Sequence, residues 1–454
     1  MRLTSARSRE LGHQSTSVSV SALVLIILAV AVLRLAGISL AFPQGSGSFP
    51  DEVSYAALAD ILARAGDWAG WNGGEGATLV PGSLSLLAPT SVFVKVGVSP
   101  LVAVRLTSVL FSVVAQMTFL AILMSLAPSG EERNSRRLTL KSWRFVALTA
   151  MMLFPSAVFW TSLGLKDSIV ISTSLLAVLA CMRIREGLGR WSSIVWAFVL
   201  VVSLIVQLLS RAYVLIALVA AIGIYGVWCS TATIRRYRFP IRSWRAAVLV
   251  ATSTSIVLAG LYMSASTSRG DSSLAGSVIT SIGAQSPLQH LDALPGIRER
   301  AARLGASGFI IEICSGQPAP RSAACEVVRL PQALGTVVAR PIWPLDDMSR
   351  WSPTWARLAL LAQIDTILWC SLLGLAFALI YFRRTLSRPL SALALMYLSL
   401  AWLGMALTEG NLGTLMRHRL ILLWPLCLLV ALAGTSRKKS HREAVPTPRD
   451  PHEF

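Results

Sequence analysis

Residues 21–42, SALVLIILAVAVLRLAGISLAF, decide the fold class, and Arg34 is the only charged residue among them. About 20 apolar residues are needed to cross a bilayer as a helix, and backbone groups in hydrocarbon must bond within their own segment. This stretch therefore predicts a membrane-spanning helix. A cleaved signal peptide is the alternative, but the run is long for one and lacks a small-x-small exit site.

Further apolar runs of similar length follow the first. They are residues 101–127, 145–163, 168–182, 193–209, 213–229, 246–265, 358–382, 390–407 and 420–433. The composition agrees with this pattern, because 54% of the residues are hydrophobic and 14% are charged, whereas soluble domains carry about a quarter charged residues. We therefore predict an all-α integral membrane protein with about ten transmembrane helices.

The basic residues indicate the orientation of the chain. Clusters of arginine and lysine occupy every second short connection and both ends: residues 2–9, 133–144, 183–190, 235–245, 383–388 and 437–442. Positive loops mark the cytoplasmic side, so we expect both termini in the cytoplasm of a multi-pass plasma-membrane protein. The net charge of +19 then reflects topology and attraction to membrane lipids, and no nucleic-acid partner is expected.

This topology divides the chain into five parts. They are a cytoplasmic tail (1–17), a membrane domain (18–266), an extracytoplasmic segment (267–356), the last transmembrane helices (357–434) and a disordered cytoplasmic tail (435–454). A second long extracytoplasmic segment, 43–100, lies within the membrane domain and is expected to carry interfacial helices at 51–65 and 82–96. Segment 267–356 is expected to be α-rich.

The helix expected at 51–65 is amphipathic. Its predicted apolar stripe consists of Val53, Ala57, Leu58, Ile61, Leu62 and Ala65.

Two of the six cysteines, Cys314 and Cys325, lie in segment 267–356. An oxidising compartment there would favour a disulfide between them, and two free thiols are the alternative. The other cysteines lie in or beside the predicted spans and are expected to be apolar packing residues.

The acidic pair Asp51-Glu52 and the pair Lys166-Asp167 are predicted to lie at the extracytoplasmic ends of helices. Polar groups near membrane depth are costly and indicate function by default. A carboxylate at 51 could deprotonate an acceptor hydroxyl, or it could simply cap a helix with Ser48. Lys166 could bind phosphate beside a second carboxylate, or it could snorkel next to an aspartate that begins a helix.

The cluster Arg417-His418-Arg419 is predicted to lie just outside the last span. A basic cluster on the outer side runs against the positive-inside rule, so it indicates binding. Two arginines could hold a phosphate or pyrophosphate in fork geometry, and an outer-leaflet lipid head group is the alternative. Arg211 could join this phosphate site or merely end a helix. Asp365, inside a span, carries little weight by itself.

No cofactor is required by these patterns, because the sequence shows no Cys/His metal motif, phosphate-binding loop or nucleophile elbow. An acid-rich outer site could take a divalent metal, but nothing in the sequence demands one.

The order of the motifs resembles the GT-C superfamily of membrane glycosyltransferases. The motifs are Phe49-Pro50-Asp51-Glu52-x-x-Tyr55, Gly97-x-x-Pro100-x-x-Ala103-x-Arg105-Leu106, Phe154-Pro155-Ser156-x-x-Phe159-Trp160-x-Ser162-x-x-x-Lys166-Asp167 and Asn411-Leu412-Gly413-Thr414-x-x-Arg417-x-Arg419. This superfamily uses polyprenyl-phosphate sugars and includes protein O-mannosyltransferases and the lipid A aminoarabinose transferase. The last motif is similar to that of bacterial relatives from exopolysaccharide loci. The resemblance covers residues 20–215 well and the last two spans moderately.

The resemblance implies a GT-C-like fold and an inverting transfer of sugar to an extracytoplasmic glycan, lipid or protein. It implies that Asp51 is the base and Asp167 a second active-site carboxylate, with Glu52 a further catalytic candidate. The residues it implies for binding the substrate and the donor phosphate are Tyr55, Lys166, Arg211, Arg417, His418 and Arg419. One departure is Val80, since relatives often place a basic residue just before the proline that here is Pro81.

Two other functions stay open on the sequence. A polysaccharide polymerase or ligase would also need basic residues on the outer side, but its donor would be a lipid-linked oligosaccharide. A lipid or glycan transporter (flippase) would need ionisable or broken-helix features near the membrane midplane, and these are scarce apart from Asp365.

Overall fold

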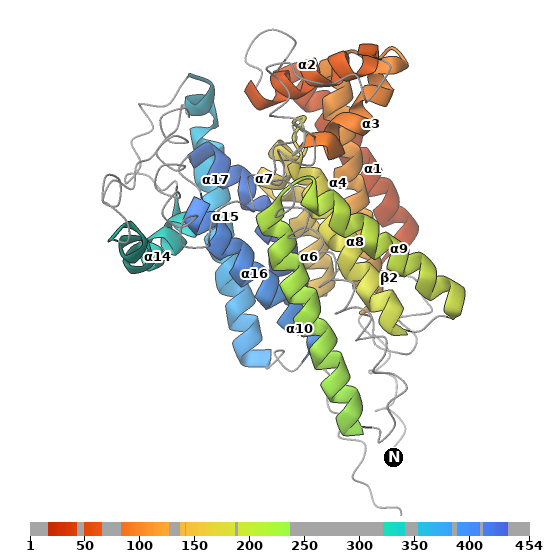
Figure 1. Cartoon of the computed structure of the whole chain (residues 1–454), viewed down its shortest axis with the longest axis vertical. Coiled ribbons are helices and arrows are strands. Elements are labelled where there is room, and N and C mark those ends of the chain that lie inside the picture. Colours follow the sequence, from red (N-terminus) through yellow and green to blue (C-terminus); the bar gives the residue numbers. More distant parts are fainter. Residues whose placement is uncertain are drawn as a thin grey trace, which may run out of the picture.

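The computed structural model describes residues 17–42, 50–65, 83–126, 137–140, 142–186, 189–236, 321–340, 353–383, 388–408 and 412–434. Its elements in chain order are β1 (Ser17–Ser19), α1 (Val20–Ala41), α2 (Pro50–Ala65), α3 (Leu84–Lys95), α4 (Pro100–Ser125), β2 (Arg137–Thr139), α6 (Trp143–Leu153), α7 (Pro155–Trp160), α8 (Asp167–Glu186), α9 (Arg190–Leu208), α10 (Ala212–Arg236), α14 (Arg321–Ala339), α15 (Pro353–Arg383), α16 (Pro389–Thr408), α17 (Leu412–His418) and α18 (Leu420–Gly434). Figure 1 shows them as a bundle with α2 and α3 at one end, which we call the α2 end.

Seven of the described helical segments are long and apolar enough to cross a membrane. They are Val20–Ala41, Pro100–Ser125, Asp167–Glu186, Trp191–Leu208, Leu360–Arg383, Pro389–Leu407 and Leu415–Ala433. Shorter apolar helices occupy Leu84–Lys95, Trp143–Leu153 and Val214–Cys229. This composition is compatible with the predicted all-α membrane class. The run predicted at 246–265 lies outside the described residues.

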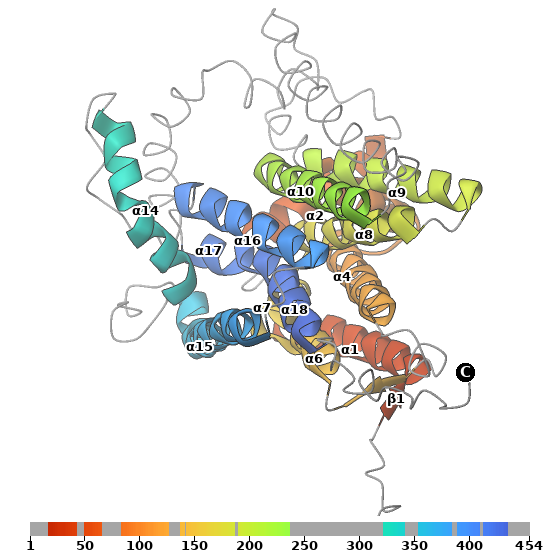
Figure 2. The ribbon, with the colours of Figure 1, turned by 90° about the horizontal axis from the view of Figure 1, so that it is seen from below.

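Helices α8 and α18 form the centre of the bundle. The most apolar window of α8 is 89% buried, and that of Leu415–Ala433, which contains most of α18, is 94% buried, against 28% in α1 and 22% in α9. Helix α18 packs against α6, α8, α15 and α16, and Figure 2 shows it between them. The outer helices instead present large apolar side chains to their surroundings, as expected of a protein whose solvent is lipid.

The third predicted span is not one helix, which corrects the prediction for residues 145–163. Helix α6 ends at Leu153, and α7 restarts at Pro155 in a new direction. Proline lacks the backbone N–H that a continuing helix needs, and it disfavours helical geometry in the preceding residue. Phe154 accordingly has φ −58° and ψ 132°. The chain then reaches α8 through residues 161–166.

A small antiparallel sheet joins the two segments that precede α1 and α6. Ser17 pairs with Thr139 and Ser19 with Arg137. The side chain of Ser19 caps α1, and that of Ser142 caps α6 in the same manner. Sequence patterns did not predict this sheet, because three residues are too few to show strand periodicity.

The helix predicted at 51–65 is confirmed as α2, but its buried stripe differs from the prediction. Leu58 and Leu62 pack with Ala59 against Leu87 of α3, whereas Val53 and Ile61 are about half exposed. The rotation of α2 follows from Glu52, which is fully buried. A helix is likewise present within the second predicted range, 82–96, as α3, and its interfacial location stays a prediction.

Candidate functional site

Four charged side chains from four segments meet at the α2 end of the bundle. Asp51 lies in the first turn of α2, Asp167 begins α8, Arg211 precedes α10 and Arg417 lies in α17. We call these four residues the carboxylate–arginine network. Figure 1 shows how far apart in sequence the contributing helices are, so only the folded chain brings these residues together.

Arg417 connects the two carboxylates of the network. Its Nη1 lies 2.5 Å from Asp51 Oδ2, and its Nε lies 3.0 Å from Asp167 Oδ2. Arg211 Nη2 lies 2.5 Å from the other oxygen of Asp167. The Asp51 side chain is 54% exposed and that of Asp167 is fully buried. The network therefore leads from the surface into the ends of the helices.

The ends of helices hold the buried half of the network in place. Asp167 is the first residue of α8, where a carboxylate is stabilised by the positive end of the helix dipole. Arg211 follows the end of α9, and its backbone N–H donates to the carbonyl of Gln207 at 2.8 Å. The amide of Gln207 in turn donates to Val170 O at 2.6 Å and to Ser174 Oγ at 2.7 Å. Gln207 thus fixes α9 against α8 and sets the distance between Arg211 and Asp167.

Lys166, Tyr55 and His418 surround the network. Burial lowers the pKa of Lys166 to about 7, and the neighbouring cations Arg211 and Arg417 act in the same direction. Burial raises the pKa of the Tyr55 hydroxyl, while Arg417 opposes that change. His418 is buried, within electrostatic reach of both arginines and the lysine. With Lys166 protonated, three cations face two carboxylates, so the site carries a net positive charge suited to an anion.

Glu52, predicted as a catalytic candidate, is not part of the network. Arg105 of α4 holds it through two hydrogen bonds, Nε to Oε1 at 2.7 Å and Nη2 to Oε2 at 3.0 Å. The backbone N–H of Gly164 also donates to Oε1, at 3.1 Å, and Arg105 Nη1 donates to Phe42 O at 2.9 Å. Both charged side chains are almost completely buried. Glu52 therefore joins α2, α4 and the connection before α8, and it is a positioning residue.

Gly164 lies too close to α4 for a side chain to fit there. A Cβ added at 164 would overlap the side chain of Val104 on α4. The close approach of the two backbones is what lets the Gly164 N–H reach the Glu52 carboxylate.

Arg419, predicted to contact phosphate, also points away from the network. It donates to the backbone carbonyls of Val337 in α14 and of Arg340 just after that helix, and to Thr366 Oγ1 of α15 at 3.1 Å. Arginine is suited to this role because its fork of N–H groups can serve several acceptors. Arg417 and Arg419, two residues apart, thus serve two different parts of the molecule.

The remaining sequence-based predictions fall partly outside the described residues. Cys325 lies in α14 and is disulfide-bonded, while its predicted partner Cys314 lies outside the described residues. Val80 and most of segment 267–356 also lie outside. Within the described part of the chain, no group of three or more His, Cys, Asp or Glu residues could hold a metal ion.

Sequence reasoning missed the positioning roles of Arg105, Gly164 and Gln207. Arg105 offered a signal, because an arginine near the start of a long apolar run needs a buried partner. Gln207 offered only a weak signal, because it is a single amide side chain near the end of a predicted span.

Comparisons of the chain with protein-family models, with curated proteins and with solved structures find no match.

Proposed function

We propose that the chain is a GT-C-type membrane glycosyltransferase that moves a sugar from a polyprenyl-phosphate donor to an extracytoplasmic glycan, lipid or protein acceptor. The observation that supports this best is the carboxylate–arginine network at the ends of apolar helices. In it, the half-exposed Asp51 shares Arg417 with the buried Asp167, which also pairs with Arg211. Such a site offers a base and an anion-binding region side by side.

In the proposed reaction, Asp51 accepts the proton of the acceptor hydroxyl. The hydroxyl oxygen forms a bond to the anomeric carbon of the sugar as the bond from that carbon to the phosphate oxygen breaks. The bonding electrons leave with the phosphate, which gains negative charge in the transition state. Arg211, Arg417 and protonated Lys166 stabilise that charge, and donors already in position do so without reorganisation.

The shared arginine gives the reaction an order. In the free enzyme, Arg417 pairs with Asp51 and occupies its carboxylate. When the donor phosphate binds Arg417, it competes with Asp51 for the same guanidinium. Asp51 is thereby released to act as a base once the donor has bound.

The proposal places the network on the extracytoplasmic side of the plasma membrane, with both termini in the cytoplasm. The polyprenyl chain would remain in the outer leaflet while its phosphate reaches the helix ends. Membrane lipids surround the apolar outer helices, whose large side chains are exposed in the bundle.

The test uses the full chain in lipid nanodiscs with a panel of polyprenyl-phosphate monosaccharides and the glycan and lipid fractions of a bacterial envelope. We expect Asp51→Asn to reduce transfer by about 10²–10⁴-fold, the usual contribution of a general base, without loss of folded protein. Asp60→Asn is the matched control, because Asp60 lies on the same helix in an exposed pair with Arg64. Normal transfer by Asp51→Asn would overturn the mechanism. Activity only with oligosaccharide-lipid donors would identify a polymerase or ligase, and lipid movement without bond formation a transporter.

A further inference from the structure

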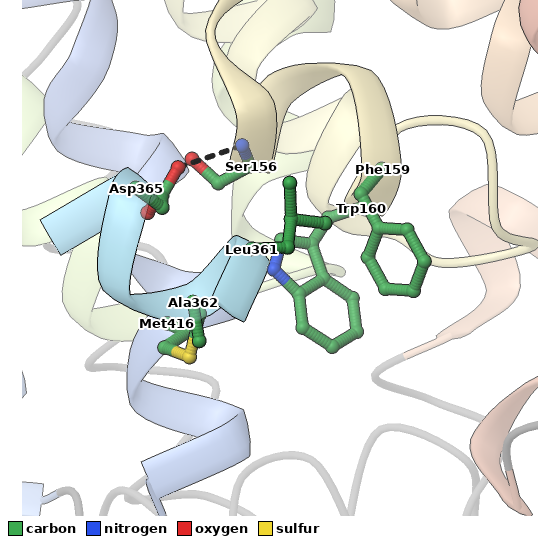
Figure 3. Close-up of a pocket in the computed structure, with 7 residues that line it drawn as sticks. All are labelled: Ser156, Phe159, Trp160, Leu361, Ala362, Asp365 and Met416. Atoms are coloured by element: carbon green, nitrogen blue, oxygen red, sulfur yellow. Dashed lines mark hydrogen bonds between the residues drawn. The ribbon is translucent and has the colours of Figure 1, made fainter. Parts of the chain in front are cut away.

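Helices α7, α15 and α17 pack together at one point. Ser156 of α7, Asp365 of α15 and Met416 of α17 line a small space there, which admits the centre of a water-sized sphere over only about 20 Å³. Such a space holds about one water molecule, so the three helices are in close contact and no larger ligand fits between them. Figure 3 shows the hydrogen bond that crosses this point, from Ser156 to Asp365.

Asp365 caps the start of α7 from another helix. The N–H groups in the first turn of a helix have no acceptor within it, and Phe154, at the N-cap position of α7, supplies no side-chain hydrogen bond. The Oδ1 of Asp365 instead accepts from the N–H of Ser156 at 2.7 Å. It thereby does for α7 what a serine or aspartate at the N-cap does for other helices. The bond fixes the start of α7 against α15.

The carboxylate of Asp365 is costly where it lies. The residue is 1% exposed and belongs to a helix long enough to span a membrane. Its Oδ2 makes no hydrogen bond with any residue in the described part of the chain, although Arg419 lies within electrostatic reach and offsets part of the cost. An apolar side chain would fill this position with less loss of hydration. The bond from Ser156 is therefore the feature that an apolar residue could not supply.

Helix α7 leads directly to the carboxylate–arginine network. Residues 161–166 connect it to Asp167, the first residue of α8. Asp167 Oδ2 lies 3.0 Å from Arg417 Nε, yet neither of these two atoms makes a hydrogen bond with any residue that the structure describes. No directional bond between the two atoms fixes this distance, so it follows from where the two segments of chain lie.

Contacts on two sides place residues 161–166, which precede Asp167. On one side, the backbone of Gly164 and that of Leu165 form hydrogen bonds with side chains of α2 and α4. On the other side, α7 packs against both α15 and α17. Asp365 thus fixes α7 on the side of α17, the helix that supplies the arginine of the pair.

We propose that Asp365 is a positioning residue, which sets the distance between Asp167 and Arg417 by capping α7. Its effect on catalysis rests on the proposed glycosyltransferase function, in which both residues shape the site for the donor phosphate. A displacement of about 1 Å in an active site can cost about 100-fold in rate. A hydrogen bond outside the network can therefore control transfer.

The first experiment measures the coupling between Arg417 and Asp167 by thermal unfolding of the full chain in detergent. The melting temperatures of Arg417→Gln, Asp167→Asn and the double variant give this coupling as the departure from additivity. The same cycle is then repeated in the Asp365→Leu background. We expect the coupling to fall to about half or less, since the attraction between two charges weakens as their distance grows. An unchanged coupling would overturn the proposal.

Three further variants make this result specific. Asp365→Asn keeps an oxygen that can accept from the Ser156 N–H, so its coupling should stay close to that of the original chain. Ser371→Ala is the matched control on α15, because the Ser371 hydroxyl is exposed and donates to Ile367 O within the same helix. Asp365→Ala removes the acceptor without adding bulk, and it replaces Asp365→Leu if that variant does not fold. A loss of coupling in Asp365→Asn as large as in Asp365→Leu would assign the effect to the charge and overturn the capping role.

The second experiment measures transfer kinetics with the polyprenyl-phosphate donors. We expect Asp365→Leu to lower kcat/KM by about 10–100-fold, with Asp365→Asn and Ser371→Ala close to the original chain. If the original chain transfers no sugar, the proposed function fails, while the unfolding cycle still decides the positioning role. If the original chain transfers sugar and Asp365→Leu does so at the same rate, the positioning role fails and the proposed function stands.

Discussion

Asp51 and Glu52 are neighbours in the first turn of α2, yet they belong to two very different ion-pair systems. Glu52 and Arg105 are buried, and the pair is completed by the Gly164 N–H and the Phe42 carbonyl. Asp51 is half exposed and shares Arg417 with the buried Asp167. The first turn of α2 thus contributes Glu52 to a buried ion pair whose hydrogen bonds are satisfied within the protein, which we call the closed pair. It also contributes Asp51 to the partly exposed carboxylate–arginine network, which we call the open network.

The difference separates residues that hold the fold from residues available for chemistry. A closed pair has its hydrogen bonds satisfied internally, so a ligand could gain a contact only by breaking one. In the open network, one guanidinium serves two carboxylates, so an incoming anion can exchange with Asp51 at little cost. We therefore expect substitutions in the closed pair to lower stability and substitutions in the open network to lower activity.

The largest effect is expected from breaking the closed pair. Glu52→Gln leaves the Arg105 charge buried without its partner, and we expect a loss of about 3–5 kcal/mol in the free energy of unfolding. The double variant Glu52→Gln/Arg105→Met removes the stranded charge and should recover most of that loss. Thermal unfolding of the detergent-solubilised protein measures both. A double variant as unstable as the sum of its singles would contradict a closed pair.

Substitutions of Arg417 and Arg419 should give effects of intermediate size, one on donor binding and the other on structure. Arg417→Gln would remove the proposed charge-assisted contact to the donor phosphate and should raise the donor KM by about 10–100-fold, equivalent to about 1.5–3 kcal/mol. Arg419→Gln should leave the donor KM unchanged and instead loosen α14 from α15.

The readouts for this pair are initial-rate kinetics and limited proteolysis at residues 321–340. Equal loss of donor affinity in both variants would show that the two arginines are not divided between binding and structure.

The smallest effect is expected from the protonation of Lys166. Its pKa of about 7 means that the side chain is cationic below that pH and neutral above it, while a phosphodiester donor stays monoanionic. Donor KM should therefore rise about tenfold from about pH 6 to about pH 8.5, the loss of one charge contact in a partly buried site. Lys166→Arg, which keeps its charge throughout, should flatten this dependence. A rise of the same size in Lys166→Arg would assign the titration to another group.

The class of fold was predictable because apolar runs of membrane-spanning length are a strong signal. The break at Phe154 was hidden inside such a run, although Pro155 marks it. The buried face of α2 was also misassigned, because its rotation is set by the ion pair between Glu52 and Arg105, a contact across 53 positions of sequence. Short-range periodicity carries no information about such a contact.

The members of the site were predictable, but their connections were not. Charge sorting gathered Asp51, Asp167, Arg211 and Arg417 at one end of the helices, which is where the structure places them. It could not distinguish Arg417 from Arg419, since both arginines lie in one short motif. Their side chains leave the backbone about 200° apart around a helix, and only the surrounding helices decide which one reaches the carboxylates.

The proline that divides α6 from α7 helps to explain how a carboxylate is accommodated inside the bundle. A continuous helix uses nearly all of its backbone N–H groups on its own carbonyls, but the first turn after a restart leaves several of them available. The N–H of Ser156 is one of these, and Asp365 accepts from it. The break caused by a single proline thus leaves a backbone N–H free for a carboxylate more than two hundred positions later in the chain.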